Sequence, residues 1–284
     1  MNPLLWTRRR IAISVSLLLV LALAVDAFVV EPRRLVVRRA TLQLDRCPAA
    51  LDGLKIVAIG DIHAGSPGIN EAYLDKLVRI ANQQKPDLIV LLGDYVVQGV
   101  MGGKFVAPAV TAEHLKQLQC RLGTYAVLGN HDVWYDTTAV RDAFENAGIP
   151  VLENSAVEVK TPNGSFWLAG IGEFRTGHAN VSEALAIVPS WQPVIAITHN
   201  PDVFPLVPSR VVLTIAAHTH GGQVNVPLIG RPAVPSHYGA RYAIGHIRES
   251  GHDLFVTSGV GTSIIPVRFR VPPEITVLKL ATVK

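Results

Sequence analysis

The stretch from Lys85 to Asp94, KPDLIVLLGD, decides the fold that we expect for this chain of 284 residues. Its continuous apolar centre is typical of a strand buried on both faces, as in a sheet covered by helices. Asp94 follows this strand after one glycine, at the carboxyl end where open α/β sheets bind their ligands. Taken alone, a Gly-Asp pair is more often part of a turn, so its role depends on the neighbouring strands.

The stretch LKIVAIGD at residues 54–61 repeats this design, and His63 follows two residues after its final aspartate. Alternation along an extended segment turns Asp61 and His63 toward the same side. Apolar residues at 74, 77, 78 and 81 predict a helix over 71–84 between the two strands. Because a helical crossover makes the two strands parallel, their carboxyl ends meet, and Asp61, His63 and Asp94 are expected to be neighbours.

Three later strands are also expected to end in side chains that can bind a metal or transfer a proton. These side chains are Asn130, His131 and Asp132 after residues 124–129, His199 after 194–198, and His218 and His220 after 211–216. One such strand end is commonplace, but five in one chain favour a metal site over a set of turns. Helices over 111–119 and 138–147 and strands over 150–152, 156–159 and 165–171 complete the predicted α/β fold.

The donor set is too large for one divalent ion. Imidazole, amide and carboxylate ligands without sulfur suit two ions that share a bridging carboxylate, and such ligands accept Mn²⁺, Fe²⁺ or Zn²⁺. A two-metal site clamps a phosphate oxygen and turns a bridging water into hydroxide at neutral pH. A histidine outside the metal ligands can then protonate the leaving group.

In their order along the chain, these strand ends resemble the five motif blocks of the calcineurin-like metallophosphoesterases, over residues 54 to 223. The blocks are Gly60-Asp61-Ile62-His63, Gly93-Asp94, Gly129-Asn130-His131-Asp132, His199 and His218-Thr219-His220. A bacterial branch whose members carry an arginine-paired export or anchor segment is similar in the later segments Gly221-Gly222-Gln223, Gly259-Val260-Gly261 and Arg268-Phe269 to Pro273-Glu274-Ile275-Thr276. The resemblance implies a four-layer α/β/β/α sandwich, here preceded by one N-terminal hydrophobic helix.

The resemblance also implies roles for the individual residues. Asp94 would bridge two ions, His131 would protonate the leaving group without binding metal, and Asp132 would orient His131. The remaining ligands would be Asp61, His63 and His220 for the first ion, and Asn130, His199 and His218 for the second.

Charge is distributed unevenly along the chain, whose formal net charge is +4. Residues 1–39 carry seven arginines against Asp26 and Glu31, so the other 245 residues carry 19 basic and 20 acidic side chains. A nucleic-acid-binding protein would carry its basic surplus on the folded body, so nucleic acid is not an expected partner. Cys47 and Cys120 stand in no metal-type spacing and are expected to be packing residues or idle.

The basic surplus surrounds an apolar segment. Residues 11–30 are almost wholly aliphatic, with Asp26 as their one charged residue, and are long enough to cross a bilayer as one helix. We expect a membrane anchor or signal segment over residues 1–35 and a phosphoesterase domain over 50–284. Paired arginines and the small residues at 22–24 make a cleaved export signal fit almost as well as an anchor. The positive-inside rule favours a cell-membrane protein with its catalytic domain on the extracytoplasmic side, and export after signal cleavage is the alternative.

The sequence therefore predicts a binuclear metal-dependent phosphoester hydrolase, which we interpret as a phosphodiesterase that uses a metal-bridging hydroxide. Two alternatives remain open, a lipid-linked pyrophosphatase at the membrane and a non-catalytic envelope protein that binds metal. His131 argues against the second, because a pure metal binder needs no unligated acid. Substrate specificity is expected in the loops 95–110, 173–180 and 227–246.

Several other polar residues are expected to face solvent or to serve the structure. They are Glu173, Arg175, Arg241 and Arg268, with the unpaired histidines His114, His178, His237, His246 and His252. The alternative for Glu173 and Arg175 is a place in the substrate cleft, and for Arg241 and Arg268 it is a contact with phosphate.

Overall fold

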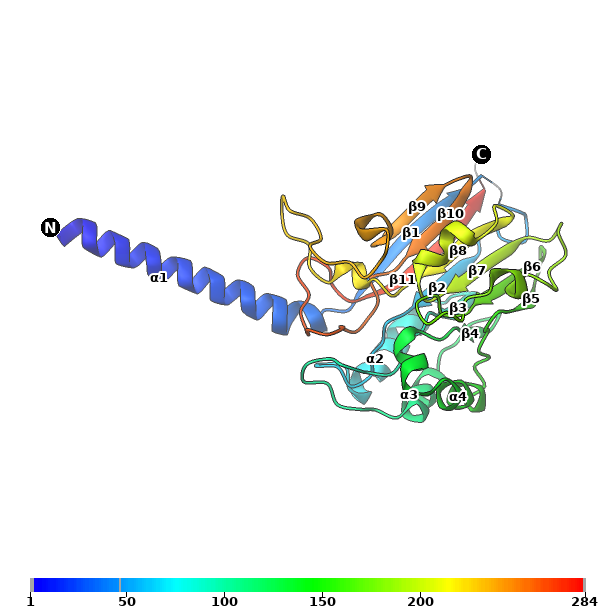
Figure 1. Ribbon diagram of the computed structural model, residues 1–284, viewed down its shortest axis with the longest axis horizontal. Coiled ribbons are helices and arrows are strands. Elements are labelled where there is room, and N and C mark those ends of the chain that lie inside the picture. Colours follow the sequence, from blue (N-terminus) through cyan, green and yellow to red (C-terminus); the bar gives the residue numbers. More distant parts are fainter. Residues whose placement is uncertain (1–2, 46, 283–284) are drawn as a thin grey trace.

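Two β-sheets form the centre of the body in the computed structural model, which describes residues 3–45 and 47–282. The first sheet has the order β1 (Val36–Leu44), β11 (Glu274–Thr282), β2 (Lys55–Ile59), β3 (Leu88–Leu91) and β4 (Thr124–Ala126). The second has the order β5 (Ser155–Thr161), β6 (Gly164–Ile171), β7 (Val194–Thr198), β8 (Val211–Ala216), β10 (His252–Val256) and β9 (Gly245–Glu249). In Figure 1 the strands of the two sheets overlap in the view, and a long helix leaves the body.

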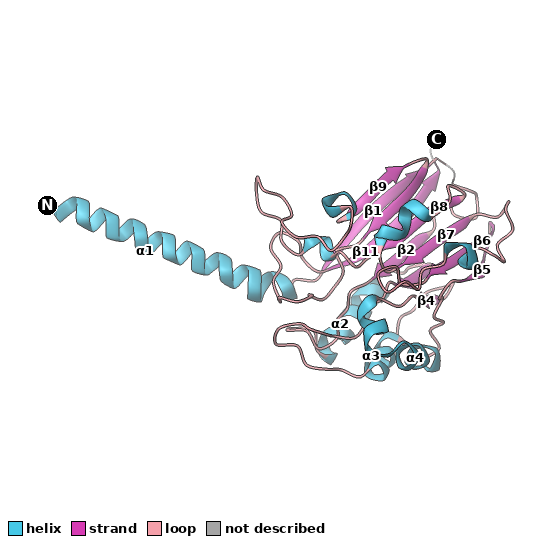
Figure 2. Ribbon diagram, viewed as in Figure 1, coloured by secondary structure: helices cyan, strands magenta, loops and turns pink. Residues whose placement is uncertain are grey.

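Alternating side chains of the first sheet build two separate cores. In β2, Val57 and Ile59 pack with the helices α2 (Glu71–Gln83), α3 (Pro108–Leu115) and α4 (Asn130–Asn146). Ile56 and Ala58 face the other way and pack in a core shared with the second sheet. Figure 2 shows the three helices gathered beside one sheet.

The outer face of the second sheet has a thinner cover. Short helical segments pack there, namely α5 (Val181–Ala184) and the 3₁₀ turns of η3 (Pro201–Leu206). This arrangement of helix, sheet, sheet and helix confirms the predicted α/β sandwich.

The strands that carry the predicted site run parallel within each sheet. β2, β3 and β4 are parallel neighbours, and β7 is parallel to β8. Their carboxyl ends therefore lie at the same edge of each sheet, as the crossover at 71–84 predicted.

Two helices begin earlier than expected. α3 starts at Pro108 because proline suits the first turn of a helix, where its missing N–H is not needed. α4 starts at Asn130, and the predicted helix over 138–147 is its second part, beyond a non-helical residue at Asp136. The motif residues 130–132 thus lie in the first turn of a helix instead of a loop.

The N-terminal helix α1 (Pro3–Val25) extends away from the body in Figure 1. Among the described residues, one helical segment, Arg8–Arg33, is long and apolar enough to cross a membrane, with a mean hydropathy of 2.6. Helical turns continue from Asp26–Val30 (η1) through Glu31–Arg33 (η2) into β1. The choice between anchor and signal, and the domain division at residues 35 and 50, stay predictions.

Removing the Phe144 ring should destabilise the body strongly. Phe144 is fully buried on α4, and its ring centroid lies 4.1 Å from that of Tyr95. We expect Phe144→Ala to lower the free energy of unfolding by about 3–5 kcal/mol, because it leaves a cavity between α4 and the first sheet. Urea denaturation in mild detergent measures this change. The control Ile187→Ala, at a site 64% exposed, should change it by less than about 0.5 kcal/mol. Equal values for the two variants would contradict the packing described.

Candidate metal centre

The structure brings all eight predicted site residues together at the carboxyl ends of the parallel strands. Each is at most 9% exposed. The first sheet and the start of α4 supply Asp61, His63, Asp94, Asn130 and His131, and the second sheet supplies His199, His218 and His220.

Two groups of donor atoms share the carboxylate of Asp94. In each group the donor atoms lie within 4.8 Å of one another. The Oδ2 atom of Asp94 lies 3.5 Å from Nε2 of His63 and 3.3 Å from Nε2 of His199. The first group is Asp61, His63, Asp94 and His220, and the second is Asp94, His199 and His218. The amide oxygen of Asn130, 3.2 Å from Nε2 of His199, adjoins the second group.

Facing nitrogen atoms in both groups suit a cation. Nε2 of His63 lies 3.3 Å from Nε2 of His220, and Nδ1 of His218 lies 3.0 Å from Nε2 of His199. Neutral imidazoles turn lone pairs toward each other in such pairs unless a proton or metal lies between them. Nδ1 of His199 donates to the Leu92 carbonyl at 2.7 Å, which leaves Nε2 as the metal-binding nitrogen. The donor set therefore fits two divalent ions.

The electrostatics of the buried groups agree with this fit. Burial lowers the pKa of His63 to about 4 and that of His218 to about 3, so both rings are neutral and can bind metal. Burial raises the pKa of Asp61 to about 7, because the positive charge near its carboxylate does not offset the cost of burying a negative charge. Burial by itself would lower the pKa of His199, but the Asp94 carboxylate outweighs this effect and raises the pKa to about 10. A proton on the His199 ring then supplies the positive charge that a metal ion would otherwise supply.

The backbone at five of these residues is left-handed. The φ angles are 50° at Asp61, 43° at His63, 56° at Asp94, 69° at His218 and 51° at His220. This conformation costs a residue with a side chain roughly 1–2 kcal/mol. Backbone strain that recurs at neighbouring polar residues is typical of a functional site, where the surrounding structure holds it in place.

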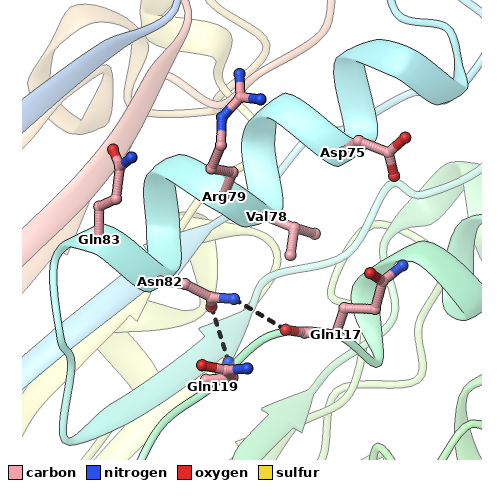
Figure 3. A pocket seen from close by; sticks show the side chains of 7 residues that line it. All are labelled: Asp75, Val78, Arg79, Asn82, Gln83, Gln117 and Gln119. Carbon is pink, nitrogen blue, oxygen red and sulfur yellow. Dashed lines mark hydrogen bonds between the residues drawn. The ribbon is translucent and has the colours of Figure 1, made fainter.

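A cavity of about 900 Å³ opens beside the donor groups. Asp94, Asn130, His131, His218 and His220 form its polar end. Arg175 also lines it, with its guanidinium 5.5 Å from the centre of the Trp134 ring. Arg175 is thus exposed, as expected, and also forms part of the cavity wall, and the sequence offered no signal for Trp134. A second hollow, along α2 beside Arg79 and Asn82, contains none of the eight residues (Figure 3).

Residues 54–222 match the family model described as calcineurin-like phosphoesterase. The chain is a calcineurin-like metallophosphoesterase. It is 34% identical over 230 residues to phosphodiesterase YaeI of Escherichia coli, covering 80% of this chain and 82% of that protein. The uncharacterized metallophosphoesterase YkuE of Bacillus subtilis is 28% identical over 255 residues, with 88% and 87% of the two chains covered. A Danio rerio transmembrane protein with metallophosphoesterase domain is 32% identical over 84% of this chain and 56% of its own length.

The family and fold predictions are thus confirmed, and the protein is a phosphoester hydrolase with Asp and His clusters suited to divalent metal. The bacterial branch with paired arginines, the metal identities and the roles of individual ligands stay predictions.

Asp132 has a different role in this metallophosphoesterase from the one predicted. Its buried Oδ2 accepts from the backbone N–H groups of Asp94 at 2.7 Å and Gly129 at 2.9 Å. Its Oδ1 accepts from those of Tyr95 at 2.9 Å and Val96 at 3.1 Å. The carboxylate therefore holds the loop after β3 against the start of α4, and none of these four bonds involves the His131 ring. Had the helix start been recognised, an acidic third residue would have indicated a carboxylate that accepts from the backbone N–H of the residue before the helix.

Arg268 of the metallophosphoesterase is fully buried, contrary to the expectation that it faces solvent. Its guanidinium donates to the carbonyl oxygens of Ser258, Gly259, Gly261 and Val271. Burial lowers its pKa to about 10, which leaves it charged at neutral pH. Glu173 is also buried, and its carboxylate accepts from the Thr176 N–H at 2.6 Å.

The other polar residues outside the site have local partners. Arg241 binds Glu249, His114 lies beside Asp75, and His246 lies beside Asp253. The thiols of Cys47 and Cys120 are free.

Replacing Asp132 should disturb metal binding although its side chain contacts the backbone N–H of Asp94 and not the Asp94 carboxylate. In Asp132→Asn, an amide NH₂ would face backbone N–H groups, and at least one buried donor would lose its acceptor. We expect stability to fall by about 2–4 kcal/mol and the bound metal to decrease, since the Asp94 loop loses its support. Urea denaturation and elemental analysis measure the two effects.

The matched control for this variant is Asp136→Asn on the same helix. Asp136 is exposed, and its Oδ1 accepts from the Ala139 N–H at 3.0 Å. Asparagine caps such a turn about as well as aspartate, so metal content and stability should be retained. Wild-type metal content and stability in Asp132→Asn would contradict the positioning role.

Proposed function

We propose that the protein is a binuclear phosphodiesterase in which Asp94 bridges two divalent ions, Mn²⁺, Fe²⁺ or Zn²⁺. The observation that carries the proposal is the position of Asp94 Oδ2, within 3.5 Å of a histidine nitrogen from each donor group. The other ligands are Asp61, His63 and His220 for the first ion, and Asn130, His199 and His218 for the second.

The bound ions supply Lewis acidity toward a phosphoryl oxygen and a hydroxide nucleophile near neutral pH. The residues of the chain position the substrate around them. Arg175 in the cavity wall presents a guanidinium that suits a phosphate oxygen, and Trp134 supports its position. The left-handed backbone at Asp94 aims the carboxylate at both groups before any ligand arrives.

His131 is placed to supply the proton that the leaving oxygen needs. Its Nε2 lies 4.0 Å from Asp94 Oδ2, and the residue lines the cavity without belonging to either donor group. Burial lowers its pKa in the free chain, and an approaching phosphate anion favours the protonated form. The proton would then be donated from Nε2 to the leaving oxygen. A protein that only stored metal would have no use for this arrangement.

The choice of a phosphodiester over a monoester draws support from the Escherichia coli relative, which is named a phosphodiesterase.

We further propose that residues 1–35 anchor the protein in the cell membrane and hold the catalytic domain, residues 50–284, on its extracytoplasmic side. The exposed apolar helix α1 and the arginines at its N-terminal end support this location.

Loss of the bridging carboxylate should remove both ions together. In Asp94→Asn, the neutral amide is a weaker ligand and attracts neither cation, so we expect metal content and hydrolysis of bis(4-nitrophenyl) phosphate to be lost together. Elemental analysis and release of 4-nitrophenol measure the two effects. A variant that keeps two ions and wild-type turnover would exclude the bridging role.

Loss of His131 should have a different result. In His131→Ala, both ions should stay bound while kcat falls by about 10²–10⁴-fold, the usual contribution of a general acid. The control His114→Ala removes a histidine that lies beside Asp75 on the outer helices, and kcat should be unchanged. If His131→Ala loses an ion, His131 is a ligand and its assignment as an acid is wrong.

A further inference from the structure

Three loops near the cavity expose large apolar side chains to solvent. We call residues 99–105, 224–235 and 261–267 the apolar rim. Met101 is 68% exposed, Leu228 is fully exposed and Ile264 is 70% exposed. Leu228 and Ile264 also have left-handed backbones, with φ of 69° and 59°. Such positions favour glycine or asparagine, and a β-branched residue there is an outlier. The fold alone gives no reason for apolar residues at these positions.

The rim loops are bonded to one another and form one surface. The Met101 N–H donates to the Ile264 carbonyl at 2.9 Å. The side chain of Gln223 donates to the carbonyl oxygens of Ser263 at 3.1 Å and Ile265 at 3.3 Å. These bonds join the segment before residue 224 to the loop 261–267, and join that loop to the loop 99–105.

The same surface is attached to the end of the apolar helix. The backbone N–H of Arg268 donates to the carbonyl of Ala27 at 2.9 Å, and that of Val271 donates to the Glu31 carboxylate at 2.6 Å. Both Ala27 and Glu31 are buried against the body. In Figure 1 the yellow loop near residue 228 and the orange loop near residue 264 project on the side from which α1 leaves. A bilayer crossed by α1 would therefore lie next to the rim.

Charge at this end of the helix suits a lipid headgroup layer. Arg33 and Arg34 are exposed directly after the apolar segment, and Arg270 is exposed beside the rim. Basic side chains at the surface of a bilayer bind the phosphates of the lipid headgroups, while apolar neighbours can enter the acyl region.

The cavity joins the rim to the metal centre. Its lining includes Asp94 and His131 of the metal centre together with Val224, Ile264 and Val267 of the rim loops. A volume of about 900 Å³ exceeds the needs of a small phosphoester, whereas an apolar wall next to a polar end matches an amphiphile.

We propose that this site takes a lipid phosphodiester directly from the bilayer, with its phosphate at the metal centre and a hydrocarbon chain against the apolar rim. This inference rests on the proposed function. Hydrolysis consumes one water, breaks one ester bond between phosphorus and oxygen, and gives a phosphomonoester and an alcohol. The alcohol oxygen takes its proton from His131.

Chain-length dependence tests the substrate class. The full chain in phosphatidylcholine vesicles is given dodecyl or methyl 4-nitrophenyl phosphate at matched metal loading. We expect wild type to prefer the dodecyl ester in kcat/KM by at least about 10²-fold, since each buried methylene contributes about fourfold. Leu228→Asp and Ile264→Asp should reduce this preference at least about tenfold. Partitioning of the ester into the vesicles is the same for every variant, so the change reports the rim alone.

Ile187→Asp is the matched control, because Ile187 is 64% exposed and lies outside the cavity lining and the rim. It should keep the wild-type preference. Cleavage of the methyl ester without a chain preference, or equal preference in rim variants and control, would overturn this inference and leave the proposed function intact. Cleavage of neither ester by metal-loaded wild type would overturn the proposed function, and this inference with it.

A second measurement is independent of turnover. An environment-sensitive fluorophore is placed at Leu228→Cys or at Ile187→Cys in a Cys47→Ala, Cys120→Ser background, and the full chain is reconstituted in vesicles. Spin-labelled phosphatidylcholine should quench the fluorophore at position 228 several-fold more than at position 187. Equal quenching at both positions would show that the rim lies away from the bilayer and would overturn the proposal.

Discussion

The geometry of the metal centre depends on four backbone N–H groups held by the carboxylate of Asp132. They come from the loop after β3 and from the residue before α4, so one buried side chain joins two consecutive strand ends. The bonds fix the peptide at Asp94 in its left-handed conformation, and the N–H of His131 then donates to Asp94 Oδ1 at 2.9 Å. The N-terminus of α4 and these N–H dipoles stabilise the buried negative charge.

The site also requires the two sheets to be packed together. Asp61 follows β2 in the first sheet, yet its Oδ1 accepts from the backbone N–H of His218 after β8 in the second, at 3.1 Å. The donor groups are thus assembled across the joint between the sheets, and the apolar core between them fixes their spacing. That core can offset the strain of five left-handed residues, because each costs only about 1–2 kcal/mol. Metal ions stabilise the folded protein further only once they bind.

The sequence predicted well which residues lie together at the strand ends, because the relation between a buried strand and the polar residue after it is local. The helix over 71–84 was likewise evident from its apolar period. The role of Asp132 was not, since three of its partners are backbone groups 36–38 positions earlier, which no side-chain pattern reveals. Arg268 was misplaced for the same reason, because the carbonyl groups that surround it come from a loop path set by tertiary packing. The loop 261–267 carried no spacing signal and was not among the loops in which substrate specificity was expected.

The buried Arg268 explains how the distance between the membrane segment and the metal centre can be fixed. Its guanidinium binds the carbonyl of Gly261, and the N–H of that glycine donates to the carbonyl of Asp61 at 2.6 Å. Its own backbone N–H binds Ala27 at the end of the apolar helix. A candidate metal ligand and the base of α1 are thus separated by a short series of hydrogen bonds through one rigid loop, with Ile264 at the tip of that loop. A charge buried in this position holds the loop by many polar contacts, so one hydrogen-bonded loop connects the rim to the metal centre.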